Sequence, residues 1–317
     1  MSNVQQLRSG LWQIDTHFLG LPGIIASYLL AGNGEVALVD TGPSTTIEAL
    51  LAGVHAAGFA LTDVTHLLLT HIHLDHAGAS GSLTQRLPNA TVYVHEIGAP
   101  HLMDPTKLIA SAERIYGAEM ERLWGTIEPV PAERIKTMRD NDVLAVAGRR
   151  LNIVYAPGHA THQVAFHDPA TAEIFCGDAA GVRLQGVDYV RPPTPPPELN
   201  LEDWSATIDR LLALNPRVLY LAHFGPTTDA PRHFTALRQR LYAWGELVLA
   251  AMRAGKDEEG IREELINRSL PELQQVTSNP DDLRRYEIAT NYRMTVQGYM
   301  RYYRKVHPEL LDQKQAQ

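Results

Sequence analysis

The sequence predicts an α/β fold that is followed by an all-helical region. Through about residue 230, short apolar runs typical of strands alternate with segments whose apolar residues have helical spacing. Beyond that point the strand patterns disappear and only helical patterns remain. We therefore expect one α/β domain over residues 1–230 and a C-terminal helical extension over residues 231–317.

The strands expected in the first half of the α/β domain are apolar or alternating runs between glycine, proline or polar residues. They lie at residues 11–19, 23–31, 35–40, 64–70 and 90–96. Residues 42–59 are expected to form a helix, because a Ser/Thr cluster precedes apolar residues at helical spacing. A second helix is expected over residues 77–88, where Pro88 ends it.

Residues 97–138 break this pattern and are expected to form a helical insertion. Apolar side chains from Leu108 to Trp124 recur every three or four residues, which indicates an amphipathic helix or a pair of helices. A proline-rich loop is expected at residues 181–200, followed by a helix at residues 201–214. The strands of the second half are expected at residues 143–148, 150–158, 163–168, 173–180 and 217–226.

The composition limits the classes of partner. The chain carries 28 Lys and Arg against 36 Asp and Glu, a net charge of −8, so no nucleic-acid partner is expected. The single cysteine excludes an intrachain disulfide and a cysteine-rich zinc module. The N-terminal residues lack a signal-peptide pattern, and no apolar run is long enough for a bilayer. We expect a cytoplasmic protein that acts on a small-molecule substrate and does not bind a membrane.

Polar motifs follow several of the expected strands. "THIHLDHAG" (residues 70–78) places three histidines and an aspartate directly after the strand at 64–70. The other motifs are "ALVDTGPS", "VYAPGHATH", "IFCGDAAG" and "LYLAHFGP". Because the strands of one sheet end at a common edge, these side chains are expected to converge. Imidazole and carboxylate groups without thiolates suit zinc, iron or manganese, and the spacing of the histidines favours two neighbouring ions.

"THIHLDHAG" resembles the HxHxDH signature of the metallo-β-lactamase superfamily. "LVDTG", "PGHATHQ", "CGDAA" and "LAHFG" match further motifs of that family in order, over roughly residues 11–226. The resemblance implies an αββα sandwich with its ligands at the rim of the sheets. It implies a first metal site of His71, His73 and His159. It implies a second site of Asp75, His76 and His223, with Asp178 bridging both.

The resemblance also implies a hydrolase that uses two divalent ions, zinc first and iron or manganese as alternatives. A hydroxide between the ions would attack the substrate, and Asp75 and Asp178 are the expected catalytic residues. Asp40 is expected to orient metal ligands. His162 departs from the family pattern, in which many members carry glycine, and is expected to contact the substrate or the ligands.

The substrate is expected to be a carboxylic ester, lactone or thioester with an apolar acyl group. Trp124, Tyr189, Met103 and Leu108 are the candidates for an apolar pocket wall. Two alternatives remain open, a phosphodiesterase or nuclease and a mononuclear-iron persulfide dioxygenase. The helical extension is expected either to cap the cleft or to form a homodimer, because its apolar residues recur at helical spacing.

Overall fold

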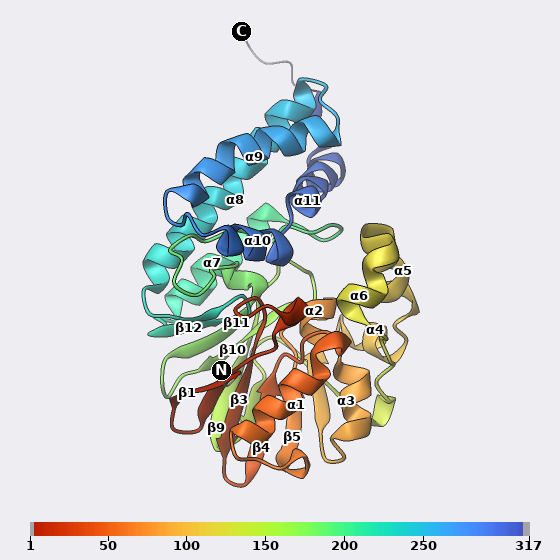
Figure 1. Cartoon of the computed structure of the whole chain (residues 1–317), viewed down its shortest axis with the longest axis vertical. Coiled ribbons are helices and arrows are strands. Elements are labelled where there is room, and N and C mark those ends of the chain that lie inside the picture. The colour runs from red at the N-terminus through yellow and green to blue at the C-terminus, as the bar shows by residue number, and fades with distance from the viewer. Residues whose placement is uncertain (1–2, 313–317) are drawn as a thin grey trace.

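The computed structural model describes residues 3–312. Two β-sheets pack face to face, and helices cover the outer side of each sheet (Figure 1). The first sheet is mixed, in the order β1-β2-β3-β4-β5-β6-β7. Its strands are β1 (Val4–Arg8), β2 (Leu11–Asp15), β3 (Ala26–Gly32), β4 (Glu35–Val39), β5 (Val64–Leu68), β6 (Thr91–His95) and β7 (Ile135–Met138). The first four pair antiparallel, and β4 to β7 pair parallel.

The second sheet has the order β13-β12-β11-β10-β9-β8. Its strands are β8 (Val143–Val146), β9 (Arg149–Tyr155), β10 (Val164–Asp168), β11 (Glu173–Gly177), β12 (Val218–Leu221) and β13 (Gly225–Thr227). Only the β11–β12 pair is parallel. The αββα sandwich that the sequence predicts is therefore confirmed.

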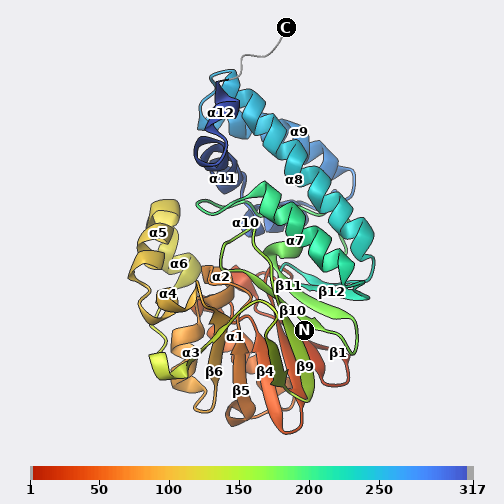
Figure 2. The same cartoon turned by 180° about the vertical axis from the view of Figure 1, so that it is seen from behind.

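Helices cover the outer face of each sheet. α1 (Ile47–Ala56) and α3 (Ser80–Arg86) pack on the first sheet, and α7 (Leu201–Ala213) packs on the second (Figure 2). Their apolar residues fall on one face, as helical spacing requires. The remaining α-helices are α2 (Leu74–Ala77), α4 (Ala99–Met103), α5 (Thr106–Tyr116), α6 (Met120–Trp124), α8 (Ala230–Arg253), α9 (Glu258–Gln274), α10 (Pro280–Ala289), α11 (Tyr292–Lys305) and α12 (Pro308–Leu311).

The space between the sheets is filled by alternate residues of the strands. Tyr28 and Leu30 of β3 face this core, whereas Leu29 between them faces the helices on the outer side. Phe166 of β10 and Phe175 of β11 meet them from the second sheet. This period of two is what a strand buried on both faces requires.

The C-terminal helices pack against the second sheet's helical layer. A hydrophobic cluster joins Trp204 of α7 to Leu241 of α8, Leu265 of α9 and Tyr299 of α11. Helices α7 to α11 each begin at an Asn or Asp whose side chain accepts a backbone N–H of the first turn. These residues are Asn200, Asp229, Asp257, Asn279 and Asn291. The division into two domains at residue 230 stays a prediction.

Two features differ from the expected elements. Strand β1 at residues 4–8 was not predicted, because the polar sequence "VQQLR" has little apolar alternation and its burial is partial. The insertion at 97–138 is α-helical only as far as Trp124. The return to the sheet that "IEPVPAERI" (residues 127–135) predicts comes later than expected, because a 3-10 turn at Ala132–Arg134 precedes β7 at the edge of the first sheet. Within residues 3–312, no helix has both the length and the apolarity needed to cross a bilayer.

Candidate metal centre

Seven side chains converge at the rim of the sandwich, each just beyond the end of a strand. His71 and His73 lie between β5 and α2, and Asp75 and His76 lie in α2 itself. The other three follow β9, β11 and β12 and are His159, Asp178 and His223. The structure therefore brings together every residue expected to bind a metal.

The ligand atoms fall into three overlapping groups, and within each group they lie within 4.8 Å of one another. The groups are His71, His73 and His159; His71, His76 and Asp178; and Asp75, His76 and His223. In the first group, Nδ1 of His73 lies 3.1 Å from Nε2 of His71 and 2.9 Å from Nε2 of His159. The first and third groups have the composition of the two expected sites.

The carboxylate of Asp178 faces both of these sites. Its Oδ2 lies 3.4 Å from Nε2 of His159, on the side of the first site. Its Oδ1 lies 3.4 Å from Nε2 of His76 and 3.4 Å from Nε2 of His223, on the side of the second. One oxygen for each site is the arrangement that a bridging ligand needs.

Four of the imidazoles are fixed through the ring nitrogen that faces away from the centre. In each of them Nδ1 has an acceptor, so Nε2 is left to face the other ligands. The acceptors are Thr70 Oγ1 at 3.1 Å for His71, Asp40 Oδ2 at 2.9 Å for His76, the Pro193 carbonyl at 2.8 Å for His159 and the Ile24 carbonyl at 2.7 Å for His223.

Three buried atoms at the centre have no hydrogen-bond partner among the described residues. They are Nε2 of His76, Nε2 of His223 and Oδ1 of Asp178. A buried polar atom without a partner costs free energy, and here three such atoms point at one another. A divalent cation would satisfy all three, so the residues present fit a metal site.

The electrostatics of the two sites differ. Burial lowers the pKa of His73 and of His159 to about 4, so both rings are neutral at pH 7 and present lone pairs. Burial also opposes protonation of His76 and His223, but the carboxylates of Asp75 and Asp178 outweigh it and raise the pKa of both rings. A cation would therefore displace protons at the second site.

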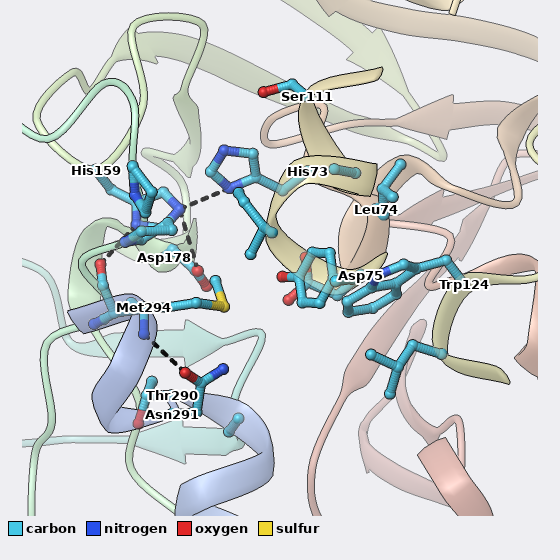
Figure 3. A pocket seen from close by; sticks show the side chains of 18 of the residues that line it. His73, Leu74, Asp75, Ser111, Trp124, His159, Asp178, Thr290, Asn291 and Met294 are labelled. Atoms are coloured by element: carbon cyan, nitrogen blue, oxygen red, sulfur yellow. Dashed lines mark hydrogen bonds and ion pairs between the residues drawn. The ribbon is translucent and has the colours of Figure 1, made fainter. Parts of the chain in front are cut away.

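A cavity of about 630 Å³ opens over the centre and reaches the helical insertion. His73, Asp75, His159 and His223 line it together with Trp124, and Figure 3 shows Trp124 on the opposite side of the cavity from His159. This volume is typical of a pocket for a small molecule. Leu108 also lines the cavity, as expected.

Two residues expected in the pocket wall lie elsewhere. The prediction is wrong for Tyr189, because its ring turns into a cluster with Tyr286 at a centroid distance of 5.7 Å, where Arg240 covers its face. Met103 is 41% exposed at the end of α4 and does not line the cavity. Both errors arise because an apolar residue near the site can pack against neighbouring helices instead.

His162 lines the cavity and touches the loop that carries the first ligands. Its Nδ1 accepts a hydrogen bond from the backbone N–H of Ile72 at 3.4 Å, and its Nε2 lies 3.3 Å from Glu198. Burial lowers the pKa of His162 to about 3, so the ring is neutral. His162 thus links the ligand loop to the proline-rich loop.

The C-terminal helices contribute to this cavity, in line with the expectation that the helical extension caps the cleft, but sequence reasoning did not identify Ala289 or Met294 as lining residues. Residues Glu287–Thr295, at the end of α10 and the start of α11, supply part of its lining, including Ala289 and Met294. They lie more than 60 residues beyond His223, the last ligand motif. The carbonyls of Pro193 and Ile24 were also missed, because a backbone acceptor leaves no signature in the sequence.

Known proteins with similar sequence or structure share this architecture. The crystal structure of the metallo-beta-lactamase family protein TTHA1429 from Thermus thermophilus superimposes with a TM-score of 0.71 at 26% identity, covering 95% of each chain. The metallo-beta-lactamase fold-containing protein ST1585 of Sulfurisphaera tokodaii is 28% identical over 221 residues, which are 68% of this chain and 78% of that protein.

A hydroxyacylglutathione hydrolase of Fuscovulum blasticum is 29% identical over 189 residues, 60% of this chain and 57% of its own length. The chain thus spans only about half the length of the hydroxyacylglutathione hydrolases that it matches. The sequence profile of the metallo-beta-lactamase superfamily matches residues 20–223, which contain all seven converging side chains. The chain belongs to the metallo-β-lactamase superfamily.

Proposed function

We propose that the protein hydrolyses a carboxylic ester, lactone or thioester with two bound divalent metal ions, zinc being the first candidate. One observation carries this proposal. Two groups of ligand atoms share the carboxylate of Asp178 at the base of a cavity that fits a small molecule.

The residues would have distinct roles. His71, His73 and His159 would hold one ion, and Asp75, His76 and His223 the other, with Asp178 contacting both. Ions held there would lower the pKa of a water molecule and polarise the acyl oxygen of the substrate. These roles follow from the ligand types and from the orientation of each ring.

Asp75 is also placed to move a proton. Its side chain is 22% exposed and lines the cavity, whereas that of Asp178 is 4% exposed. His76 and His223 lower the pKa of Asp75 to about 2 against the effect of burial, so it is ionised at pH 7. An ionised carboxylate at this position could accept a hydrogen bond from the attacking water and pass its proton towards the leaving group, provided that a bound ion has first made that water more acidic.

The relatives support acyl hydrolysis more than another reaction. A hydroxyacylglutathione hydrolase, by its name, hydrolyses an acylglutathione, and the one from Fuscovulum blasticum is 29% identical to this chain over 189 residues. An atrochrysone carboxyl ACP thioesterase of Aspergillus fumigatus is 26% identical over 202 residues and, by its name, also acts on a thioester. These matches cover 57% and 50% of the two relatives, respectively.

Metal analysis combined with an assay panel tests the proposal. The purified chain is expected to hold about two ions and to hydrolyse at least one ester, lactone or thioester. His159→Ala is expected to lower kcat/KM by about a thousandfold or more, since one ligand is lost, whereas His55→Ala at an exposed position is expected to leave it unchanged. No turnover across the panel with both ions bound would refute the proposal. One iron per chain with oxygen uptake would favour the dioxygenase.

A further inference from the structure

We propose that the cavity is an acyl-chain channel, in which an unbranched aliphatic chain lies between the insertion helices and the turn that joins α10 to α11. This inference rests on the proposed function and names its substrate class, an ester or thioester with a medium-length aliphatic acyl group. It also assigns residues that set the length of that chain. Two apolar walls and the position of the charged side chains carry the argument.

The first wall comes from the helical insertion and the loop after β2. The rings of Phe18 and Trp124 stack at a centroid distance of 5.5 Å, and Tyr116 meets Trp124 edge-on at 5.0 Å. Leu108 and Leu123 belong to the same hydrophobic cluster and line the cavity, yet both are only partly buried. Aromatic packing therefore holds this surface in place, while the side chains of Leu108 and Leu123 stay partly exposed to the cavity.

The second wall comes from the C-terminal helices. Ile288, Ala289 and Met294 line the cavity, and the first two belong to the same cluster as Trp124. Figure 3 shows Met294 with Thr290 and Asn291 on one side of the cavity and Trp124 on the other. Apolar side chains thus face one another across the space that leads to the metal centre.

The second wall is held in place by buried contacts. The hydroxyl of Tyr286 donates to the Tyr189 carbonyl at 2.5 Å and accepts from the N–H of Leu184 at 3.3 Å. Glu287 lies 3.6 Å from Arg191, a guanidinium that is 2% exposed. These contacts anchor α10 to the proline-rich loop, so the channel exists before a substrate enters.

Polarity changes along the cavity from the metal centre outward. Asp75 and the ligand histidines lie at the base, buried or half-buried, next to the apolar walls. Most other charged residues of the lining are exposed and mixed in sign: Lys107, Glu119, Arg122, Glu287 and Arg293. Glu198 is partly buried, and its carboxylate lies 3.3 Å from His162. An acyl carbonyl at the metal centre would therefore continue into a chain that contacts apolar walls rather than charges.

The volume sets the scale of the substrate. A water molecule occupies about 30 Å³ in the liquid, so 630 Å³ corresponds to roughly twenty water molecules, or to a substrate with a similar number of non-hydrogen atoms. Each methylene removed from water strengthens binding by about three- to fourfold until the chain fills the channel. Affinity is expected to rise with chain length and then to level off or fall.

The test measures chain-length dependence in binding and in turnover on the metal-loaded protein. Methyl ketones of increasing length, which cannot be hydrolysed, are titrated by calorimetry. p-Nitrophenyl esters from acetate to myristate are assayed for kcat/KM. Ala289→Phe is expected to fill part of the channel and shift both optima to shorter chains, whereas Leu108→Ala is expected to shift them to longer ones. Ala118→Phe, at an exposed position outside the lining, is the matched control and is expected to leave the profile unchanged.

The outcomes separate this inference from the proposed function. If ketone affinity follows chain length and the two variants shift it in opposite directions, the channel is supported even when no ester is turned over. If esters are hydrolysed but neither affinity nor kcat/KM depends on chain length, the channel is refuted while hydrolysis stands. Circular dichroism melting of each variant shows that it is folded, and Leu108→Ala provides a second test should Ala289→Phe fail to fold.

Discussion

The carboxylate of Asp40 accepts a hydrogen bond from Nδ1 of His76 at 2.9 Å, deep beneath the metal centre. The same carboxylate accepts the backbone N–H of Thr70 at 2.8 Å and the Thr70 hydroxyl at 3.0 Å. Asp40 adopts a φ of 58°, which L residues rarely take but aspartate tolerates. The buried carboxylate of Asp40 thus orients the His76 ring and also holds the backbone just after β5.

Asp40→Ala is expected to lower the affinity for the metal at the second site by about 10- to 100-fold. The reason is that His76 loses the acceptor that fixes its tautomer and ring orientation. Competition with a chelator, followed by metal analysis, measures the change. Asp63→Ala removes a carboxylate that lies outside the centre and serves as the control. Equal affinities for the two variants would show that Asp40 has no part in metal binding.

Asp178→Asn tests whether one carboxylate serves both sites. Its two oxygens each lie 3.4 Å from a ligand nitrogen of a different site, so the neutral amide is expected to reduce the bound metal from about two ions to one or fewer. Elemental analysis after gel filtration gives the ratio. Asp188→Asn at an exposed position should keep the wild-type content. Two ions retained by Asp178→Asn would exclude the bridging role.

The metal ligands could be predicted from sequence because their chemistry is concentrated in short motifs. His71, His73, Asp75 and His76 fall within six residues, directly after an apolar strand, and that strand ends at the rim. Asp40 and Asp178 are likewise the first polar residues after strands β4 and β11. Strand ends converge by geometry, and the resemblance to the metallo-β-lactamase superfamily then implied which of the distant residues, His159, Asp178 and His223, serve as ligands.

The walls of the cavity could not be predicted in the same way. Trp124 and Tyr189 are both large aromatic residues in segments between motifs, yet Trp124 lines the cavity and Tyr189 packs against Tyr286. Tyr189 is turned away from the cavity by its packing against Tyr286 of α10, whereas Trp124 is held at the cavity by stacking on Phe18. Met294 also lines the cavity, and it comes from a helix without any ligand motif.

Gly298→Ala tests how tightly the C-terminal helices are coupled to the proline-rich loop. A Cβ at position 298 would lie 1.9 Å from the carbonyl oxygen of Thr194, so α11 or the loop must move. We expect a loss of about 1–3 kcal/mol in the free energy of unfolding. Gly260→Ala in α9 is the control, because its nearest atom is the end of the Asp257 side chain at 3.2 Å. Urea unfolding measures the free energy of unfolding of both variants. Equal values would show that α11 and the loop accommodate the new Cβ without a loss of stability.

His233 is expected to make stability fall in acid. Its Nε2–H donates to the Ala180 carbonyl at 2.6 Å, and burial lowers its pKa to about 4. In the unfolded chain the pKa is about 6.5, so the unfolded state binds more protons between those values and folding weakens as pH falls from 6.5 towards 4. Relative to His233→Gln, which keeps a donor, the wild type is expected to lose up to ~3 kcal/mol over that range. Urea unfolding at a series of pH values measures the difference, and parallel profiles for the two proteins would contradict the assignment.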